Sequence, residues 1–232
     1  MNSKYLQPKK YFYYVIKKIK GFFSNLENHG ERVDIVFSNP VLLDENEKCH
    51  LKRYQFASEC IKGTDTVGDF ACGTGYGTAL LATKAATVLG IDIDSRVVSK
   101  IAQKYKHTPT ISFKHGDLLQ IDFVEQFDRI VSFETIEHFI ETDIVKLLHL
   151  FNTALKPGGM LIMSTPYMQK DDRQALRAGF HKTFFINEEK IKEWLSQSMF
   201  DTLDFYYQSY DWPAVSKADV DKDFVICIAH KS

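Results

Sequence analysis

The feature that most constrains the fold is a regular alternation of strand and helix patterns that begins at residue 66. Short runs rich in β-branched residues alternate with helical periodicity, which is typical of βαβ units. Strands are predicted at Thr66–Phe70, Val88–Asp92, Thr110–Phe113, Arg129–Phe133, Met160–Ser164, Thr202–Ser209 and Phe224–His230. Helices are predicted at Gly75–Lys84, Ser95–Tyr105, Ile140–Leu155 and Asn187–Gln197. We therefore expect an α/β fold, a doubly wound and mostly parallel seven-stranded sheet with helices on both faces.

Composition and charge exclude several classes of protein. The chain is 44% hydrophobic and 25% charged, as globular proteins are, and its net charge of −1 argues against nucleic acid as the partner. The cysteines Cys49, Cys60, Cys72 and Cys227 have neither metal-site nor disulfide spacing. These cysteines, and the lack of a signal-peptide pattern, lead us to expect free thiols in a reducing cytoplasm. No apolar run approaches the roughly 18 to 20 residues that a membrane span needs, so we expect no membrane span. The sequence carries no signal for an oligomeric state.

Residues 1–30 form a basic segment that differs from residues 31–232, where we expect one folded domain. The charged side chains of residues 1–25 are all lysines: Lys4, Lys9, Lys10, Lys17, Lys18 and Lys20. Apolar side chains recur beside them at helical spacing: Phe12, Val15, Ile16, Ile19, Phe22 and Phe23. One interpretation is a helix that packs on the domain or on a partner subunit. The other is a helix that lies on anionic headgroups, which would make the protein peripheral to the inner face of the membrane.

A glycine-rich turn follows the first predicted strand, in the sequence DFACGTGYG at residues 69–77. Glycines there let backbone amides approach a ligand closely. A dinucleotide fingerprint would read GxGxxG, but here the glycines stand at 73, 75 and 77, and position 78 is threonine. Asp69 at the strand end would repel a pyrophosphate, whereas it could hold an ammonium group. The turn therefore points away from NAD.

Acidic residues also end the next two predicted strands. Asp92 is the last residue of the second strand, where a carboxylate can accept both hydroxyls of a ribose. Asp117 stands just after the third strand, in HGDL at residues 115–118. Ligands of open α/β sheets bind along the edge formed by these strand ends. Together with Asp69, the pattern describes a site for an adenosine that carries an amino acid and no phosphates.

Five segments resemble the class I S-adenosylmethionine-dependent methyltransferases, in family order over roughly residues 50–230. They are DFACGTGYG (69–77), VLGIDID (88–94), HGDL (115–118), FDRIVSFETIEH (127–138) and LKPGGMLIMSTP (155–166). The resemblance implies a Rossmann-like methyltransferase fold, S-adenosylmethionine as cofactor and methyl transfer as the activity. One departure is Ala71, where the family more often has glycine.

By this resemblance, Asp69 and the Gly73–Gly75 turn would hold the methionine part of the cofactor, and Asp92 would hold the ribose. Ile93 would cover the adenine, Asp117 would meet its amino group, and the Leu118 amide would meet a ring nitrogen. The complete set of cofactor residues that the resemblance implies is Arg53, Asp69, Ala71, Cys72, Gly73, Gly75, Asp92, Ile93, Gly116, Asp117 and Leu118.

Arg53 enters that set through a second resemblance. Gly30-Glu31-Arg32 and the segment HLKRYQFA at residues 50–57 are similar to the leader of bacterial methyltransferases encoded with surface-glycan assembly genes. The planar guanidinium of Arg53 suits the carboxylate of the cofactor. The alternative is a surface arginine on a helix.

The candidate acceptor residues follow the fourth predicted strand. Glu134, Glu137 and His138 would share one face of a helical turn, and His181 could add a fourth ligand to a divalent ion such as Mg²⁺ or Mn²⁺. The ExxEH pattern is similar to the metal-binding motif of quinone-biosynthesis and small-RNA 2′-O-methyltransferases, and to the ETIEH of glycan-type relatives. Two alternatives stay open: His138 or His181 as a metal-free general base, with Glu134 beside them, or a carboxylate that caps the next helix.

Residues 166–186 form a polar insertion that we expect to act as a lid over the acceptor. Its side chains that could face a sugar or an anion are Tyr167, Lys170, Arg173, Arg177 and Lys182. The preferred function is O-methylation of a saccharide hydroxyl, in a nucleotide sugar or a lipid-linked glycan. A quinone-ring O-methyltransferase comes second and an RNA 2′-O-methyltransferase third, and a non-enzymatic module that binds the cofactor is the alternative of a different class.

Overall fold

The computed structural model describes residues 43–170, 181–217 and 221–232. All of them belong to one compact unit, residues 35–232. The predictions for the basic segment at residues 1–30, for Gly30-Glu31-Arg32, and for Arg173 and Arg177 of the insertion lie outside the described residues.

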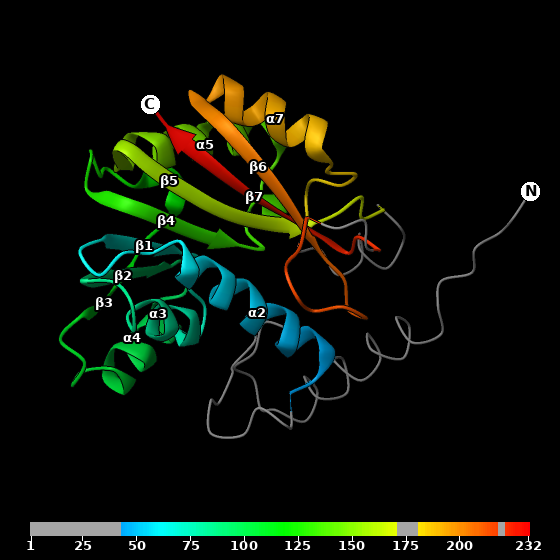
Figure 1. The fold of residues 1–232 in the computed structure, drawn as a ribbon. Coiled ribbons are helices and arrows are strands. Elements are labelled where there is room, and N and C mark those ends of the chain that lie inside the picture. Colours follow the sequence, from blue (N-terminus) through cyan, green and yellow to red (C-terminus); the bar gives the residue numbers. More distant parts are fainter. Residues whose placement is uncertain (1–42, 171–180, 218–220) are drawn as a thin grey trace, which may run out of the picture. The chain divides into compact units, whose positions relative to one another are not determined.

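A seven-stranded sheet forms the centre of the fold, with the strand order β3-β2-β1-β4-β5-β7-β6 (Figure 1). The strands are β1 Thr66–Phe70, β2 Thr87–Asp92, β3 Ile111–His115, β4 Phe127–Phe133, β5 Leu155–Pro166, β6 Phe200–Gln208 and β7 Phe224–Lys231. Strand β7 runs antiparallel to both β5 and β6, and the other neighbouring pairs are parallel. The predicted doubly wound, mostly parallel sheet is confirmed.

Helices cover both faces of this sheet. They are α2 Glu45–Glu59, α3 Tyr76–Leu81, α4 Ser95–Lys104, α5 Glu141–Ala154 and α7 Glu188–Gln197, with short 3₁₀ turns η2 Leu118–Gln120 and η3 Ile136–His138. The chain steps one way along the sheet from β1 to β3 and the other way from β4 to β5. Because parallel crossovers are right-handed, these opposite steps place α3 and α4 on one face and α5 on the other. Helix α2 packs against α3, and α7 packs against α5 (Figure 1).

Helix α2, the longest helix within the described residues, has no counterpart among the predicted elements. It begins with a capping box: the Asp44 carboxylate accepts the Glu47 amide at 2.9 Å, and the Glu47 carboxylate accepts the Asp44 amide at 2.7 Å. This reciprocal pair satisfies two amide groups that the first turn of a helix leaves without partners. An acidic residue followed three positions later by Glu was therefore the readable signal for this helix.

Strand β5 is longer than predicted, because it starts at Leu155, where the sequence predicts the end of a helix. Leu155 pairs with Phe127, and the register shifts before Arg129 pairs with Met160. The shift accommodates the Lys156-Pro157-Gly158-Gly159 turn, in which Gly158 adopts a φ of 71°. A proline and two glycines therefore interrupt the pairing locally without ending the strand.

Aromatic side chains fill the core between the sheet and α5. The ring of Phe70 lies 5.5 Å from the ring of Phe127 and 5.1 Å from that of Phe151, both at edge-on angles. All three side chains are fully buried. Edge-to-face contacts of this kind stabilise a core beyond the area that they bury, and they fix the strands whose ends form the site. Within the described ranges, none of the helices combines the length and apolar character that a membrane span requires.

Helix α3 approaches α2 so closely that only glycine fits at position 77. A Cβ atom added there would lie 2.1 Å from Cζ of the buried Tyr54 ring. We expect Gly77→Ala to lower the free energy of unfolding, because overpacking costs about 1–3 kcal/mol and the better helix propensity of alanine offsets about 1 kcal/mol. Urea denaturation would measure this. Gly63→Ala is the control, since the nearest atom to its added Cβ is 3.8 Å away. Equal midpoints for the two variants would contradict the close approach.

The carboxylate of Glu188 joins α7 to three other segments. It accepts hydrogen bonds from the Tyr207 hydroxyl at 2.5 Å, the Tyr167 hydroxyl at 2.9 Å and Nζ of Lys222 at 3.3 Å. Burial alone would raise its pKa, but these bonds and its own backbone amide together lower the pKa of Glu188 from 4.5 to about 2.

A carboxylate whose pKa is lower in the folded state than in the unfolded state stabilises the folded state at every pH above its unfolded pKa. This stabilisation is lost as the pH falls from 4.5 towards 2. We therefore expect Glu188→Gln to lower the free energy of unfolding at pH 7 by at most about 3 kcal/mol, and the difference from wild type to shrink towards pH 2. Urea denaturation at several pH values measures both. Glu189→Gln, an exposed neighbour in the same first turn, is the control. A deficit that is independent of pH would show that the ionised carboxylate is not responsible.

Candidate cofactor and acceptor site

The carboxyl ends of β1, β2 and β3 lie side by side, and each carries or precedes one of the predicted acids. Asp69 stands in β1, Asp92 ends β2, and Asp117 follows β3. The parallel register, with Asp92 opposite His115, brings the second and third of these strand ends level. The three acids therefore lie along one edge of the sheet, as their positions in the sequence predict.

The turn after β1 has a left-handed backbone at three positions. Ala71, Gly73 and Gly75 adopt φ values of 63°, 53° and 74°. A non-glycine residue in this region costs roughly 1–2 kcal/mol, which explains why glycine is the usual residue at the position of Ala71. Cys72 between them is buried, its amide donates to the Ile91 carbonyl at 2.9 Å, and burial raises the pKa of its thiol well above the ordinary value.

The carboxylate of Asp92 holds this turn in place. One of its oxygens accepts the Gly73 amide at 2.9 Å, and the other accepts the Asp94 amide at 2.9 Å. The next side chain, Ile93, is 67% exposed. An exposed apolar side chain beside a carboxylate is the arrangement that the predicted ribose and adenine contacts require.

The segment after β3 turns back towards the same edge. The Gly116 amide donates to the Asp92 carbonyl at 3.1 Å. Asp117 caps the short turn η2, with its carboxylate accepting the Leu119 amide at 2.9 Å and the Gln120 side chain at 3.0 Å. Leu118 is buried in the core. The predicted adenine contacts of this segment remain predictions.

Asp69 is fully buried, and both of its oxygens already accept hydrogen bonds within the protein. Oδ1 accepts from the Tyr54 hydroxyl at 3.0 Å and Oδ2 from the Thr78 hydroxyl at 2.6 Å. Burial raises the pKa of Asp69 to about 6, although these two hydrogen bonds act to lower it. Through Tyr54 and Thr78, Asp69 therefore holds α2 and α3 at the start of the turn at residues 71–75, which we call the cofactor turn. The direct contact of Asp69 with an ammonium group remains a prediction.

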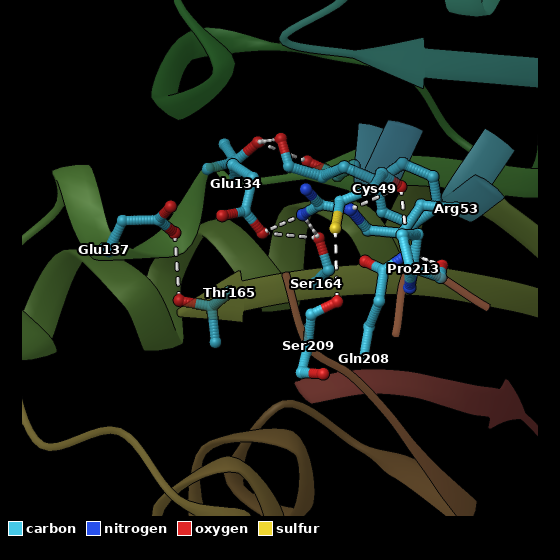
Figure 2. A network of polar contacts seen from close by, with 12 residues as sticks. Cys49, Arg53, Glu134, Glu137, Ser164, Thr165, Gln208, Ser209 and Pro213 are labelled. Carbon is cyan, nitrogen blue, oxygen red and sulfur yellow. Dashed lines mark hydrogen bonds and ion pairs between the residues drawn. The ribbon is translucent and has the colours of Figure 1, made fainter. Parts of the chain in front are cut away.

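Arg53 is 0% exposed, so the interpretation as a surface arginine is wrong. Its Nη1 forms an ion pair with Glu134 and donates to the Ser164 hydroxyl at 3.0 Å (Figure 2). The guanidinium lies over the Phe224 ring, 4.4 Å from its centroid. Among the described residues, Nη2 finds no hydrogen-bond acceptor although it is buried. A ligand carboxylate could supply one.

Glu134 is turned towards Arg53. It adopts a φ of 50°, its amide donates to the Ser164 carbonyl at 3.0 Å, and its carboxylate accepts the Ser164 hydroxyl at 2.7 Å. The predicted α-helical turn is wrong here, because only Ile136–His138 are helical and they form a 3₁₀ turn. Glu134 therefore does not share a face with Glu137 and His138.

Glu137, His138 and His181 do come together. Ligand atoms from these three residues lie within 4.8 Å of one another. The rings of His138 and His181 are 5.0 Å apart at 78°. Figure 2 shows the buried Glu137, whose carboxylate accepts the Thr165 hydroxyl at 3.0 Å. The amides of Lys182 and Thr183 donate to the Glu137 carbonyl at 2.8 and 3.2 Å. These backbone bonds hold the His181 segment beside η3.

The donor set of this cluster fits a divalent cation. An ion about 2.1 Å from each of its ligands needs ligand atoms no more than about 4.2 Å apart, so a small inward movement would suffice. Two imidazoles and one carboxylate favour a transition metal over Mg²⁺, which prefers oxygen ligands. The same geometry also suits a histidine base with a neighbouring carboxylate.

The sequence did not single out several residues that hold these groups in place. Tyr54 and Thr78 bind Asp69, Ser164 binds Arg53 and Glu134, and Thr165 binds Glu137. Ser164 and Thr165 directly follow the apolar run of β5. A polar pair at the end of a buried strand was therefore the available signal, because it lies at the same edge as the acids.

Comparison with known proteins agrees with this geometry. Residues 67–159 match the family model described as a methyltransferase domain. The chain is 32% identical over 130 residues to a probable S-adenosylmethionine-dependent methyltransferase of Mycolicibacterium smegmatis; the match covers 55% of this chain and 48% of the relative. The chain thus spans about half the length of that curated relative.

Two solved structures share the fold. A S-adenosylmethionine-dependent methyltransferase from Clostridium acetobutylicum aligns over 97% of this chain and 100% of its own, with a TM-score of 0.63 and 13% identity. The N-methyltransferase NodS from Bradyrhizobium japonicum, in complex with S-adenosyl-L-homocysteine, aligns over 84% and 89% with a TM-score of 0.59 and 21% identity. The two structures show the fold, and the match of residues 67–159 to a methyltransferase domain, together with the relatives, supports an enzyme that uses S-adenosylmethionine.

The Asp92 carboxylate provides a test of the cofactor assignment. We expect Asp92→Ala to weaken binding of S-adenosylhomocysteine by about 1.5–3 kcal/mol, because it removes a charged acceptor at the ribose position and releases the Gly73 amide. Titration calorimetry measures the affinity, and NAD should give no heat. Asp122→Ala, which alters an exposed acid away from the turn, is the control. An Asp92→Ala variant with wild-type affinity would refute the assignment.

Proposed function

We propose that this protein, as a class I S-adenosylmethionine-dependent methyltransferase, transfers the methyl group to a hydroxyl oxygen of a saccharide. The acceptor would be a nucleotide sugar or a lipid-linked glycan. The observation that carries the proposal is the convergence of Glu137, His138 and His181 at the edge where β4 and β5 end. Because β4 lies next to β1 and β5 next to β4, this group follows the turn and the acids assigned to the cofactor along the same edge of the sheet.

The chemistry of the transfer explains why such a group is needed. A sulfonium is already a good leaving group, so the enzyme has to align the acceptor oxygen in line with the methyl group and remove the hydroxyl proton. Either His138 or His181 can accept that proton, and the buried Glu137 carboxylate beside them stabilises the imidazolium that forms.

A metal-assisted variant uses the same three residues. Glu137, His138 and His181 would hold the ion, which when bound would lower the pKa of a coordinated acceptor hydroxyl. Glu134, the fourth predicted ligand, remains with Arg53 and Ser164. The role proposed for Glu134 is therefore to position Arg53 for the cofactor.

The polar side chains around this edge support a saccharide acceptor. Lys182 is exposed next to His181, and Tyr167 and Lys170 stand at the start of the insertion. A quinone precursor is the second candidate, because Met168 and Phe185 are 42% and 40% exposed at the base of the same insertion. Apolar side chains there would suit a flat ring, or the lipid part of a lipid-linked glycan.

Turnover in the presence of a chelator distinguishes a mechanism with a histidine as general base from one with a bound metal ion. If the three residues bind an ion, chelation should abolish methyl transfer while S-adenosylhomocysteine still binds, and Mn²⁺ should restore transfer better than Mg²⁺. If a histidine acts alone, the chelator should have no effect, and His138→Ala or His181→Ala should lose about 10²–10⁴-fold in rate. His149→Ala, an exposed histidine on α5, is the control.

The acceptor class is tested with a panel of saccharides, catechol-like quinone precursors and RNA, with tritiated methyl transfer as the readout. We expect transfer to saccharides alone. Transfer only to catechols would replace the saccharide proposal with the quinone one. Cofactor binding without transfer to any acceptor would favour a non-enzymatic module.

A further inference from the structure

Two adjacent hydroxyl residues, Ser164 and Thr165, stand next to the end of β5. Each of them is only 1% exposed. Strand β5 pairs with β7 in one unbroken register from Met160 to Pro166, so the strand is regular here. Successive side chains of a regular strand point to opposite faces of the sheet. The two hydroxyls therefore lie on opposite faces.

The packing of β5 agrees with this alternation. Leu161 and Met163 share a face with Thr165, and they belong to the core that includes residues of α5 and α7. Ser164 instead meets Arg53 of α2, whose Nη1 donates to the Ser164 hydroxyl at 3.0 Å. One strand end thus presents one hydroxyl to the side of α2 and another to the side of α5 and α7.

Each hydroxyl donates to a different carboxylate of the segment after β4. Ser164 donates to Glu134 at 2.7 Å, and Thr165 donates to Glu137 at 3.0 Å (Figure 2). A hydroxyl has a single proton to donate, so each can hold one of the acids and not both. Glu134 is thereby held on the side of Arg53, and Glu137 is held beside the two histidines of the acceptor-side cluster.

We propose that Thr165 is a positioning residue for the acceptor-side cluster and holds the Glu137 carboxylate beside His138 and His181, while Ser164 holds Glu134 for the cofactor side. The inference rests on the proposed function, because it assigns Thr165 to the group that would deprotonate or coordinate the acceptor. Thr165 acts through Glu137 and not on the acceptor itself. Partners of this kind typically change activity or metal affinity by about 10- to 100-fold.

Two substitutions of Thr165 separate this role from a purely structural one. Valine removes the hydroxyl and keeps the β-branched shape that suits a strand, so the buried Glu137 loses a donor while the packing is retained. Serine keeps the hydroxyl and removes a buried methyl group, so packing is lost while the donor remains. Valine is the more harmful change if the hydroxyl matters, and serine is the more harmful change if packing alone matters.

The first test is ¹H–¹³C NMR of the histidine rings in the full chain, with chelator and without cofactor or acceptor. The signals of His138 and His181 are assigned by their loss in His138→Asn and His181→Asn. We expect Thr165→Val to shift both signals, because the carboxylate beside the rings changes position, and Thr165→Ser to leave them as in the wild type. Thr87→Val, the same change at an exposed threonine that begins β2, is the control. Unshifted signals in Thr165→Val, or equal shifts in Thr165→Ser, would overturn the proposal.

The second test is a split between turnover and cofactor affinity. In the saccharide assay, Thr165→Val should lower kcat about 10- to 100-fold with little change in the affinity for S-adenosylhomocysteine, and Thr165→Ser should keep most of the wild-type kcat. Ser164→Ala should show the reverse, with weaker S-adenosylhomocysteine binding and unshifted histidine signals.

An unaltered kcat in Thr165→Val would refute the functional part of the proposal. Histidine signals that move in Ser164→Ala as they do in Thr165→Val would refute the separate holding of the two acids. The NMR readout needs neither cofactor nor acceptor, so it decides the positioning of Glu137 even if the wild type methylates no saccharide. Failure of the proposed function and failure of this inference are therefore distinguishable.

Discussion

The ion pair between the buried guanidinium of Arg53 and the carboxylate of Glu134 is the interaction on which the rest of the site depends. Removing a guanidinium from water costs several kcal/mol unless it is paired and hydrogen-bonded. Glu134 supplies the opposite charge, and Ser164 and the Cys49 carbonyl accept hydrogen bonds (Figure 2). The Phe224 ring covers one face of the guanidinium. One side chain thereby joins α2 to β5 and β7 and to the end of β4. Helix α2 also holds Asp69 through Tyr54, and β5 also holds Glu137 of the acceptor-side cluster through Thr165.

This pairing separates two carboxylates that the sequence places only three positions apart. Glu134 is needed to neutralise Arg53, so Glu137 is the acid that joins the two histidines. Within the described residues, Nη2 of Arg53 has no acceptor, which supports the prediction that a cofactor carboxylate binds there, since a buried donor without an acceptor costs about 1–3 kcal/mol. In this interpretation, the ion pair between Arg53 and Glu134 links the cofactor side of the site to the acceptor side.

The fold was predictable because its signals are local. Alternating strand and helix patterns gave β1 with its observed bounds, and the right-handed crossover rule gave the faces of the helices. The positions of Asp69, Asp92 and Asp117 at one edge follow from the parallel strands, whose carboxyl ends lie at the same edge. The pairing of Arg53 with Glu134 could not be predicted in this way, because the two residues meet only through the packing of α2 against the sheet. The expected convergence of Glu134 with Glu137 failed because it assumed an α-helical spacing where the chain forms a 3₁₀ turn.

Several non-glycine residues around the site have a left-handed backbone. Ala71 lies in the cofactor turn, Glu134 faces Arg53, and Met168 and Phe185 flank the base of the insertion. Such conformations persist only where the surroundings determine them, here through hydrogen bonds of Glu134 to Ser164 and of Phe185 to Gln169. No propensity scale predicts them, since each is locally unfavourable. Four of the six such residues in the described part of the chain lie around this edge, and the other two, Glu125 and Met199, precede β4 and β6.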